Sequence, residues 1–298
     1  MMHGCTSGRG VRTRMSRISI GVMACLVCAA AALAAQGANP PSIPNFAPDD
    51  STSWFPDREA GDDYLPPESG PGPVLSDPAH PYVPNDGGRN TGRQPTYRVA
   101  DLTNPILQPW TIAPMKKAND EVLAGKVPFM ARERCWPPGV PGFDIFRRVA
   151  PVYLMQTPKE VVMIWPSDQQ VRHVYLNVPH SRSVKPSWYG ESVGHYEGDT
   201  LVVDTIGLND KTFIDNYRTP HTERLHVVER FKLIEDGKTL QISIQVDDPG
   251  AFTMPWRAVQ RFMRWREGPM VPSACSENNF DFFTYKVEPI PRADRPDF

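Results

Sequence analysis

Residues from Val152 onward alternate apolar and polar side chains, and this period of two constrains the fold more than any other feature. Three pairs of alternating segments are joined by short polar stretches: PSDQQ at 166–170, Gly198-Asp199, and EDGK at 235–238. Such a pattern predicts strands joined in antiparallel hairpins. With further strands expected around 261–267 and near 282–287, the chain should be mainly β, with six to eight strands in an antiparallel meander. This order favours a lipocalin-like barrel, which has no exposed edges, over a sandwich.

Proline sets the organisation of the rest of the chain. Most of the 33 prolines lie in its first half, and proline fixes φ and removes a backbone donor that a sheet interior needs. We therefore predict a Pro-rich linker or extended surface segment over residues 35–100 and a single β-rich domain over 101–298. One short helix is predicted at 114–125, where three apolar residues share a face and Gly125 can end the helix.

The first 34 residues have the parts of a secretory signal peptide. Four arginines precede an apolar run from Ile18 to Leu33 that ends in AAALAAQ, and cleavage after Ala34 fits best. The run is short for a spanning helix, which needs about twenty apolar residues. A partial lipoprotein box ending at Cys25 would leave a cramped apolar region. No later segment is apolar for long enough to span a bilayer, so we predict a periplasmic or secreted protein.

Composition narrows the class of partner. Loss of the four leader arginines changes the formal charge from −2 to −6, and an acidic surface disfavours nucleic acid as a partner. The chain has no Gly-rich phosphate loop, no dinucleotide fingerprint and no GxSxG motif. We expect a small-molecule ligand or substrate and no cofactor. The sequence gives no indication of the oligomeric state.

The segment GHYEGDTLVVDTIG at 194–207 places charged side chains in an otherwise apolar hairpin. With a two-residue loop at its centre, alternation separates a polar face from an apolar face. The polar face carries His195, Glu197 and Asp204, and the apolar face carries Tyr196, Leu201 and Val203. Either the apolar face covers the core and the charges are solvated, or the polar face lines the barrel lumen. In the second case the three polar residues are candidate catalytic groups.

Glu229 is a further candidate for acid–base catalysis. It points the same way as four apolar residues of its strand, and a buried carboxylate is costly unless it is paired or protonated. Burial raises the pKa of a carboxyl, which suits a general acid or base. The alternative is a structural ion pair with an arginine across the sheet, such as Arg172 or Arg264. His195 and Glu229 can meet only if the sheet curls and both point into one cavity.

Other side chains near these strands could contact a ligand. The candidates are Trp188, Tyr196, His226, Arg230 and Trp256. The aromatic residues could instead pack in the core. His221, Glu223 and His226 could hold a divalent metal if the chain bends between them. Because the chain has neither HExxH nor a cysteine cluster, we predict no metal site.

Several motifs occur in an order typical of one family. They are CWPPGVP at 135–141, QTP at 156–158, WYGESVGHYEGDTLVV at 188–203, LHVVERF at 225–231, DDPGAFTMPW at 247–256 and ACSENNF at 274–280. Over residues 135–281 the chain resembles a family of secreted bacterial proteins with C-x-P-x-G-x-P, W-x-G-x-S-x-G-x-W-E-G-D-T-L-V-V, LHVVERF and C-terminal CHEGN-like motifs. The resemblance implies export and a shared fold unit, and both family cysteines match. Tyr196 stands where the family usually has tryptophan, and Ser276 and Asn278 replace its usual histidine and glycine.

Two functional hypotheses follow. The first is a secreted, cofactor-free acid–base enzyme, namely an isomerase, dehydratase or lyase, acting on a small lipophilic or aromatic compound. Its proton-transfer candidates are His195, Glu197, Asp204 and Glu229. The second is a non-catalytic periplasmic binding or carrier protein for a small lipophilic ligand. A histidine and a carboxylate lining an enclosed pocket would favour the enzyme, and an apolar lumen with the charges outside would favour the carrier.

Cys135 and Cys275 are the two cysteines that remain once the leader is removed. In an oxidising compartment a disulfide is the economical pairing, and two buried free thiols are the alternative. We expect Cys135→Ser to lower thermal stability sharply, because the bond would close a loop of about 140 residues worth up to roughly 5 kcal/mol. Thiol titration of the exported protein checks this prediction. Two titratable thiols in the native state would contradict it.

Overall fold

The computed structural model describes residues 43–49, 52–57, 61, 63–84, 96–126, 136–145, 151–166, 169–266 and 270. All of them belong to one unit of the chain, residues 43–298. The helical elements are α2 (Pro109–Leu123), η2 (Gly142–Ile145) and η3 (Glu235–Gly237). The strands are β1 (Thr52–Pro56), β2 (Tyr153–Gln156), β3 (Glu160–Trp165), β4 (Gln170–Leu176), β5 (Glu191–Glu197), β6 (Thr200–Ile206), β7 (His226–Ile234), β8 (Thr239–Asp247) and β9 (Trp256–Arg266). The predicted leader, both cysteines of the predicted disulfide and the strand expected near 282–287 lie outside the described residues.

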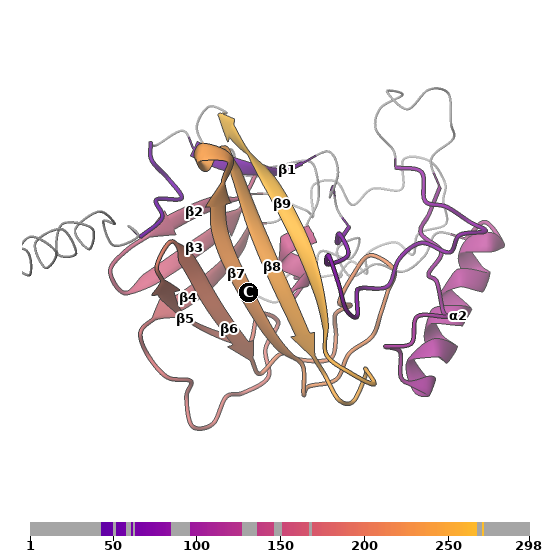
Figure 1. The fold of residues 1–298 in the computed structure, drawn as a ribbon. Helices are drawn as coiled ribbons and strands as arrows, with labels where there is room; N and C mark the ends of the chain where they lie inside the picture. The colour runs from indigo at the N-terminus through magenta and orange to yellow at the C-terminus, as the bar shows by residue number, and fades with distance from the viewer. Residues whose placement is uncertain are drawn as a thin grey trace, which may run out of the picture. The chain divides into compact units, whose positions relative to one another are not determined.

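The nine strands form one sheet in the order β1-β9-β8-β7-β6-β5-β4-β3-β2. From β2 to β9 each strand therefore lies beside the next one in sequence, and the sheet curls into a nearly closed barrel (Figure 1). The mainly β, barrel-type fold predicted from the alternation is confirmed.

Short turns fix the registers of the hairpins. Glu197 lies opposite Thr200 across Gly198 and Asp199, as predicted, and Gly198 has φ of +62°. The hairpins predicted around 166–170 and 235–238 are also present, as β3–β4 and β7–β8. Asp236 and Gly237 have positive φ, which a primed-type turn requires and which glycine adopts without steric cost.

One pair of neighbouring strands departs from the predicted antiparallel meander. β4 and β5 run parallel, with Val174 opposite Ser192. Parallel neighbours need a crossover connection rather than a tight turn. Residues 177–190 supply it, and they carry the chain back to the start of the next strand.

β1 lies where the two ends of the sheet approach each other, and it comes from the segment where proline density predicted a linker or extended surface. β1, indigo in Figure 1, pairs with β9, and Trp54 also forms two backbone hydrogen bonds of 2.8 Å with Val152 just before β2. Pro56 is the last residue of the strand, so it does not interrupt the ladder. The described part of residues 35–100 also contributes buried side chains to the core: Phe46, Trp54, Tyr64 and Val74.

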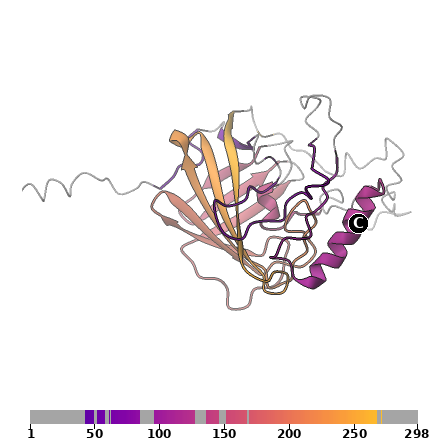
Figure 2. The same cartoon turned by 45° about the vertical axis from the view of Figure 1, so that its right-hand side comes forward.

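Helix α2 lies outside the strands, beside the connection from β8 to β9 (Figure 2). It confirms the predicted helix but begins five residues earlier, at Pro109. Met115 is buried on its inner face, and Gly125 ends it with φ of +77°. Asn119 exchanges two hydrogen bonds with the backbone of Ala100, which joins the helix to the preceding segment. Among the described residues no helix has the length and apolar character needed to cross a membrane.

We expect Trp54→Ala to destabilise the protein by about 3–5 kcal/mol, because it removes a fully buried aromatic side chain at the barrel closure. It also removes the hydrogen bond from Trp54 Nε1 to the Phe46 carbonyl. Trp265→Ala is the matched control, since Trp265 on β9 is partly exposed and packs against Phe55. Chemical denaturation of both variants tests the prediction, and equal losses would contradict it.

Candidate functional site

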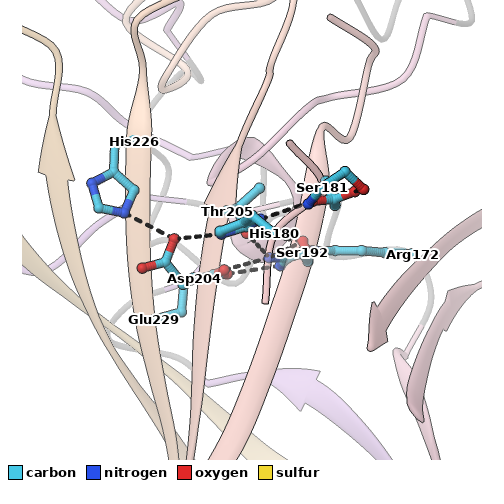
Figure 3. Close-up of polar contacts among 9 residues, drawn as sticks. Arg172, His180, Ser181, Ser192, Asp204, Thr205, His226 and Glu229 are labelled. Atoms are coloured by element: carbon cyan, nitrogen blue, oxygen red, sulfur yellow. Dashed lines mark hydrogen bonds and ion pairs between the residues drawn. The ribbon is translucent and has the colours of Figure 1, made fainter. Parts of the chain in front are cut away.

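The inner face of the barrel contains a fully buried ion pair. Arg172 on β4 donates from Nη1 to Glu229 Oε1 at 2.8 Å, and its Nη2 bonds to Oε2 (Figure 3). Both side chains are 0% exposed. Of the two partners considered for Glu229, the structure therefore selects Arg172. Burial opposes the charged guanidinium, but the charge and hydrogen bonds of Glu229, with smaller effects of Asp144 and Tyr189, together outweigh burial and raise the pKa of Arg172.

Two hydroxyl groups complete the hydrogen bonding of this guanidinium. Nη2 of Arg172 donates to Thr205 Oγ1 at 3.0 Å and to Ser192 Oγ at 3.2 Å, and the two hydroxyls lie 2.8 Å apart. Because Ser192 is on β5 and Thr205 on β6, one arginine connects side chains of four consecutive strands, β4 to β7.

Asp144 in η2 lies against this ion pair as a second buried carboxyl. Burial raises its pKa well above the ordinary value, and the negative charge of Glu229 raises it further. Its Oδ2 has no hydrogen-bond partner in the part of the chain that the structure describes. A single buried guanidinium neutralises one carboxylate, so we interpret Asp144 as the protonated member of the pair. We call Arg172, Ser192, Thr205, Glu229 and Asp144 the inner cluster.

A second polar cluster lies on the outer face of the same strands. Glu191 on β5, Asp204 on β6 and His226 on β7 occupy diagonal positions of the register, so their side chains point to the same side. His180, in the connection from β4 to β5, reaches over this face. We call His180, Glu191, Asp204 and His226 the outer cluster.

Asp204 is the central acceptor of the outer cluster. Its Oδ1 lies 2.9 Å from His226 Nε2 and 3.0 Å from His180 Nε2. Figure 3 marks both contacts with dashed lines. The other ring nitrogen of His180, Nδ1, lies 3.0 Å from Glu191 Oε1. The hydrogen bond to Asp204 raises the pKa of His226, and it lowers the pKa of Asp204. His226 and Asp204 are 41% and 40% exposed, so solvent reaches the cluster.

The prediction that His195 and Glu229 could meet in one cavity is wrong. His195 is 53% exposed and bonds to Glu197 at 3.1 Å, whereas Glu229 is enclosed. Alternation explains the separation, because the Tyr196, Leu201 and Val203 face covers the core and places His195 and Glu197 outside. Asp204 shares that outer side and joins the two histidines of the outer cluster.

The predicted ligand contacts do not converge on one site. Trp256 is buried and packs on Tyr64 and Phe252, as in the core-packing alternative. Arg230 pairs with Glu197 at 2.7 Å on the outer face. The remaining three lie apart from these: Tyr196 bonds to Gln156, Trp188 packs against Trp136, and His226 belongs to the outer cluster.

The three side chains considered for metal binding point in different directions. His221 is buried and bonds to Thr212 at 2.8 Å, Glu223 is exposed, and His226 turns toward Asp204. Among the described residues no group of three or more His, Cys, Asp or Glu side chains has the geometry to hold a metal ion.

Sequence reasoning missed five members of the two clusters: Ser192 and Thr205, which alternation places on the inner face, and Asp144, His180 and Glu191. Glu191 carried a usable signal, because it lies two residues before Val193 on the face of Asp204 in the predicted hairpin. His180 and Asp144 lie in irregular segments, where alternation gives no direction for a side chain. Comparisons of the chain with protein-family models, with curated proteins and with solved structures found no match.

We expect Glu229→Gln to destabilise the protein by about 3–5 kcal/mol, because it removes the carboxylate to which both terminal nitrogens of the buried Arg172 bond. Glu197→Gln is the matched control: Glu197 also pairs with an arginine, but on the solvent side, and the expected loss is much smaller. Thermal and denaturant unfolding of the two variants measure the difference. Similar stabilities for both would show that the buried pair does not have this structural role.

Proposed function

We propose that this protein is an exported acid–base enzyme and that the outer cluster transfers the proton. The observation that carries this proposal is the position of Asp204, which holds the accessible His226 ring by Nε2 at 2.9 Å. A carboxylate that orients an imidazole by one nitrogen leaves the other nitrogen for a substrate. Oriented bases of this kind are common in enzymes that move protons.

His226 is the residue that would exchange a proton with the substrate. Because the Asp204 carboxylate accepts at Nε2, the neutral ring keeps its proton there and Nδ1 is the basic atom. Within the described part of the chain no hydrogen bond reaches Nδ1. After Nδ1 takes a proton, the same atom can donate it. The raised pKa of His226 means that the ring keeps its second proton to a higher pH than a free imidazole does.

His180 and Glu191 are positioning residues in this proposal. A carboxylate lies at each ring nitrogen of His180, with Asp204 on one side and Glu191 on the other. Ser181 donates its backbone N–H and its hydroxyl to Glu191, and the hydroxyl bond lowers the pKa of that carboxyl. This chain of contacts fixes Asp204, and Asp204 in turn orients His226.

The reactions that fit are isomerisation, dehydration and elimination, in which a base removes a proton from carbon and the acid form returns or supplies one. The substrate we propose is a small lipophilic or aromatic compound. Support comes from the connection 177–190, which carries both His180 and Trp188. Trp188 packs on the exposed Trp136 with ring centroids 5.4 Å apart, so an aromatic surface belongs to the same segment.

A non-catalytic periplasmic binding or carrier protein for a small lipophilic ligand is the second candidate. Two observations favour it. His195 and Glu197 lie on the solvent side of the barrel. In addition, a cavity of about 590 Å³ lies beside the β7–β8 turn and is lined by no residue of either cluster.

We expect the wild-type protein to open the ring of 5-nitrobenzisoxazole faster than the same concentration of imidazole. In this elimination a base takes the proton from carbon, the N–O bond breaks, and a nitrile and a phenolate form. His226→Asn should reduce the rate to that of imidazole, and Asp204→Asn should lower the pH midpoint of the rate, because the hydrogen bond that raises the pKa of His226 is lost. Absorbance of the phenolate measures the rate.

The matched controls are His173→Asn and His195→Asn. Each of these histidines is exposed and lies within about 3 Å of a carboxylate, Glu160 or Glu197, outside the outer cluster. Neither change should alter the rate. A His226→Asn variant as active as the wild type would refute the assignment of His226, and a wild type no faster than imidazole would refute the proposed chemistry.

A further inference from the structure

Arg264 on β9 is a partly buried cation with no hydrogen-bond acceptor among the described residues. Its Nε is enclosed and has no hydrogen-bond partner, and no described residue forms a hydrogen bond or an ion pair with its guanidinium. The contrast with Arg172 is clear, since the guanidinium of Arg172 bonds to a carboxylate and two hydroxyls. An enclosed polar atom that lacks a partner is costly, and such an atom calls for an explanation.

The surroundings of Arg264 hold its side chain in place. The guanidinium carbon lies 5.8 Å from the centre of the Trp54 ring, and the backbone N–H of Arg264 donates to the Lys238 carbonyl at 2.8 Å. A methyl group placed on Gly237 would lie 3.9 Å from Arg264 Nη2. The cation is therefore fixed between a buried indole and the β7–β8 turn. The cation–π contact offsets only part of the cost of burial.

Arg264 is one of the residues that line a cavity of about 590 Å³. Its lining residues are Asp57, Glu235, Lys238, Thr239, Met263 and Arg264. The volume is within the range of sites for small molecules, which is about 300–1,000 Å³. Glu235 Oε2 already accepts a hydrogen bond from Thr239 at 2.7 Å. Arg264 thus supplies unused donors in a space large enough for a ligand.

We propose that this cavity binds a small organic carboxylate, with the carboxylate on Arg264 and the rest of the ligand against Met263. A guanidinium matches a carboxylate in shape and can donate two parallel hydrogen bonds to it. Lys238 adds a second positive charge. The carboxylates of Asp57 and Glu235 also line the cavity, and they repel a doubly charged anion such as phosphate more strongly than a singly charged one. A monoanion should therefore bind better. The site shares no residue with the outer cluster and is independent of the proposed acid–base function.

Calorimetric titration of the full-length mature protein with benzoate, benzamide and inorganic phosphate tests this proposal. Benzoate should bind at least ten times more tightly than benzamide, which has the same shape without the charge, and more tightly than phosphate. Arg264→Met should weaken benzoate binding at least ten-fold. The variant should fold normally, because the change removes a cation that makes no ion pair with any described residue.

Arg257→Met is the matched control, since Arg257 lies on the same strand and is exposed outside the cavity. It should bind benzoate as the wild type does. Melting temperatures with and without benzoate give a second measurement, because a ligand that binds the folded state raises its stability. Equal binding of benzoate and benzamide, tighter binding of phosphate than of benzoate, or unchanged binding in Arg264→Met would each overturn the proposal.

Discussion

The buried pair of Arg172 and Glu229 is the interaction on which the rest of the barrel depends. In a flat sheet β4 and β7 would lie about 14 Å apart, so curvature shortens the span that the two side chains must bridge. The hydroxyls of Ser192 and Thr205 occupy the strands between them. A charge enclosed in this way tolerates few alternative arrangements, because each displacement would leave a polar group without its partner. The pair therefore selects one curvature and one register.

The same registers produce the outer cluster. Successive residues of a strand point to opposite faces, so fixing Thr205 on the inside places its neighbour Asp204 on the outside. Glu191 and His226 then follow from the pairing of β5 and β7 with β6. The accessible cluster that we propose as catalytic is thus the other face of a rigid inner framework. Such support is what a proton-transfer site needs to keep its groups aligned.

The sequence predicted those features that short-range rules control. The two-residue loop at Gly198 and Asp199 set the register of its hairpin, and the apolar neighbours of Glu229 indicated its burial. Long-range features were beyond these rules. The parallel pairing of β4 with β5 depends on the connection 177–190, and the pairing of β1 with β9 joins distant parts of the chain. No local pattern specifies either, which is why His180 and the strand in the Pro-rich segment were missed.

The register of the strands decides which of two arginines, Arg172 or Arg264, can pair with Glu229. Glu229 lies opposite Ile244, which lies opposite Ala258 on β9. Arg264 is further along that strand by about 20 Å, beyond the reach of a side chain from Glu229. Arg172 reaches the carboxylate across the interior, and the charge of Glu229 helps to raise the pKa of the neighbouring Asp144. The register that satisfies one arginine thus leaves the other at the β7–β8 turn, beside a cavity, with its Nε unpaired among the described residues.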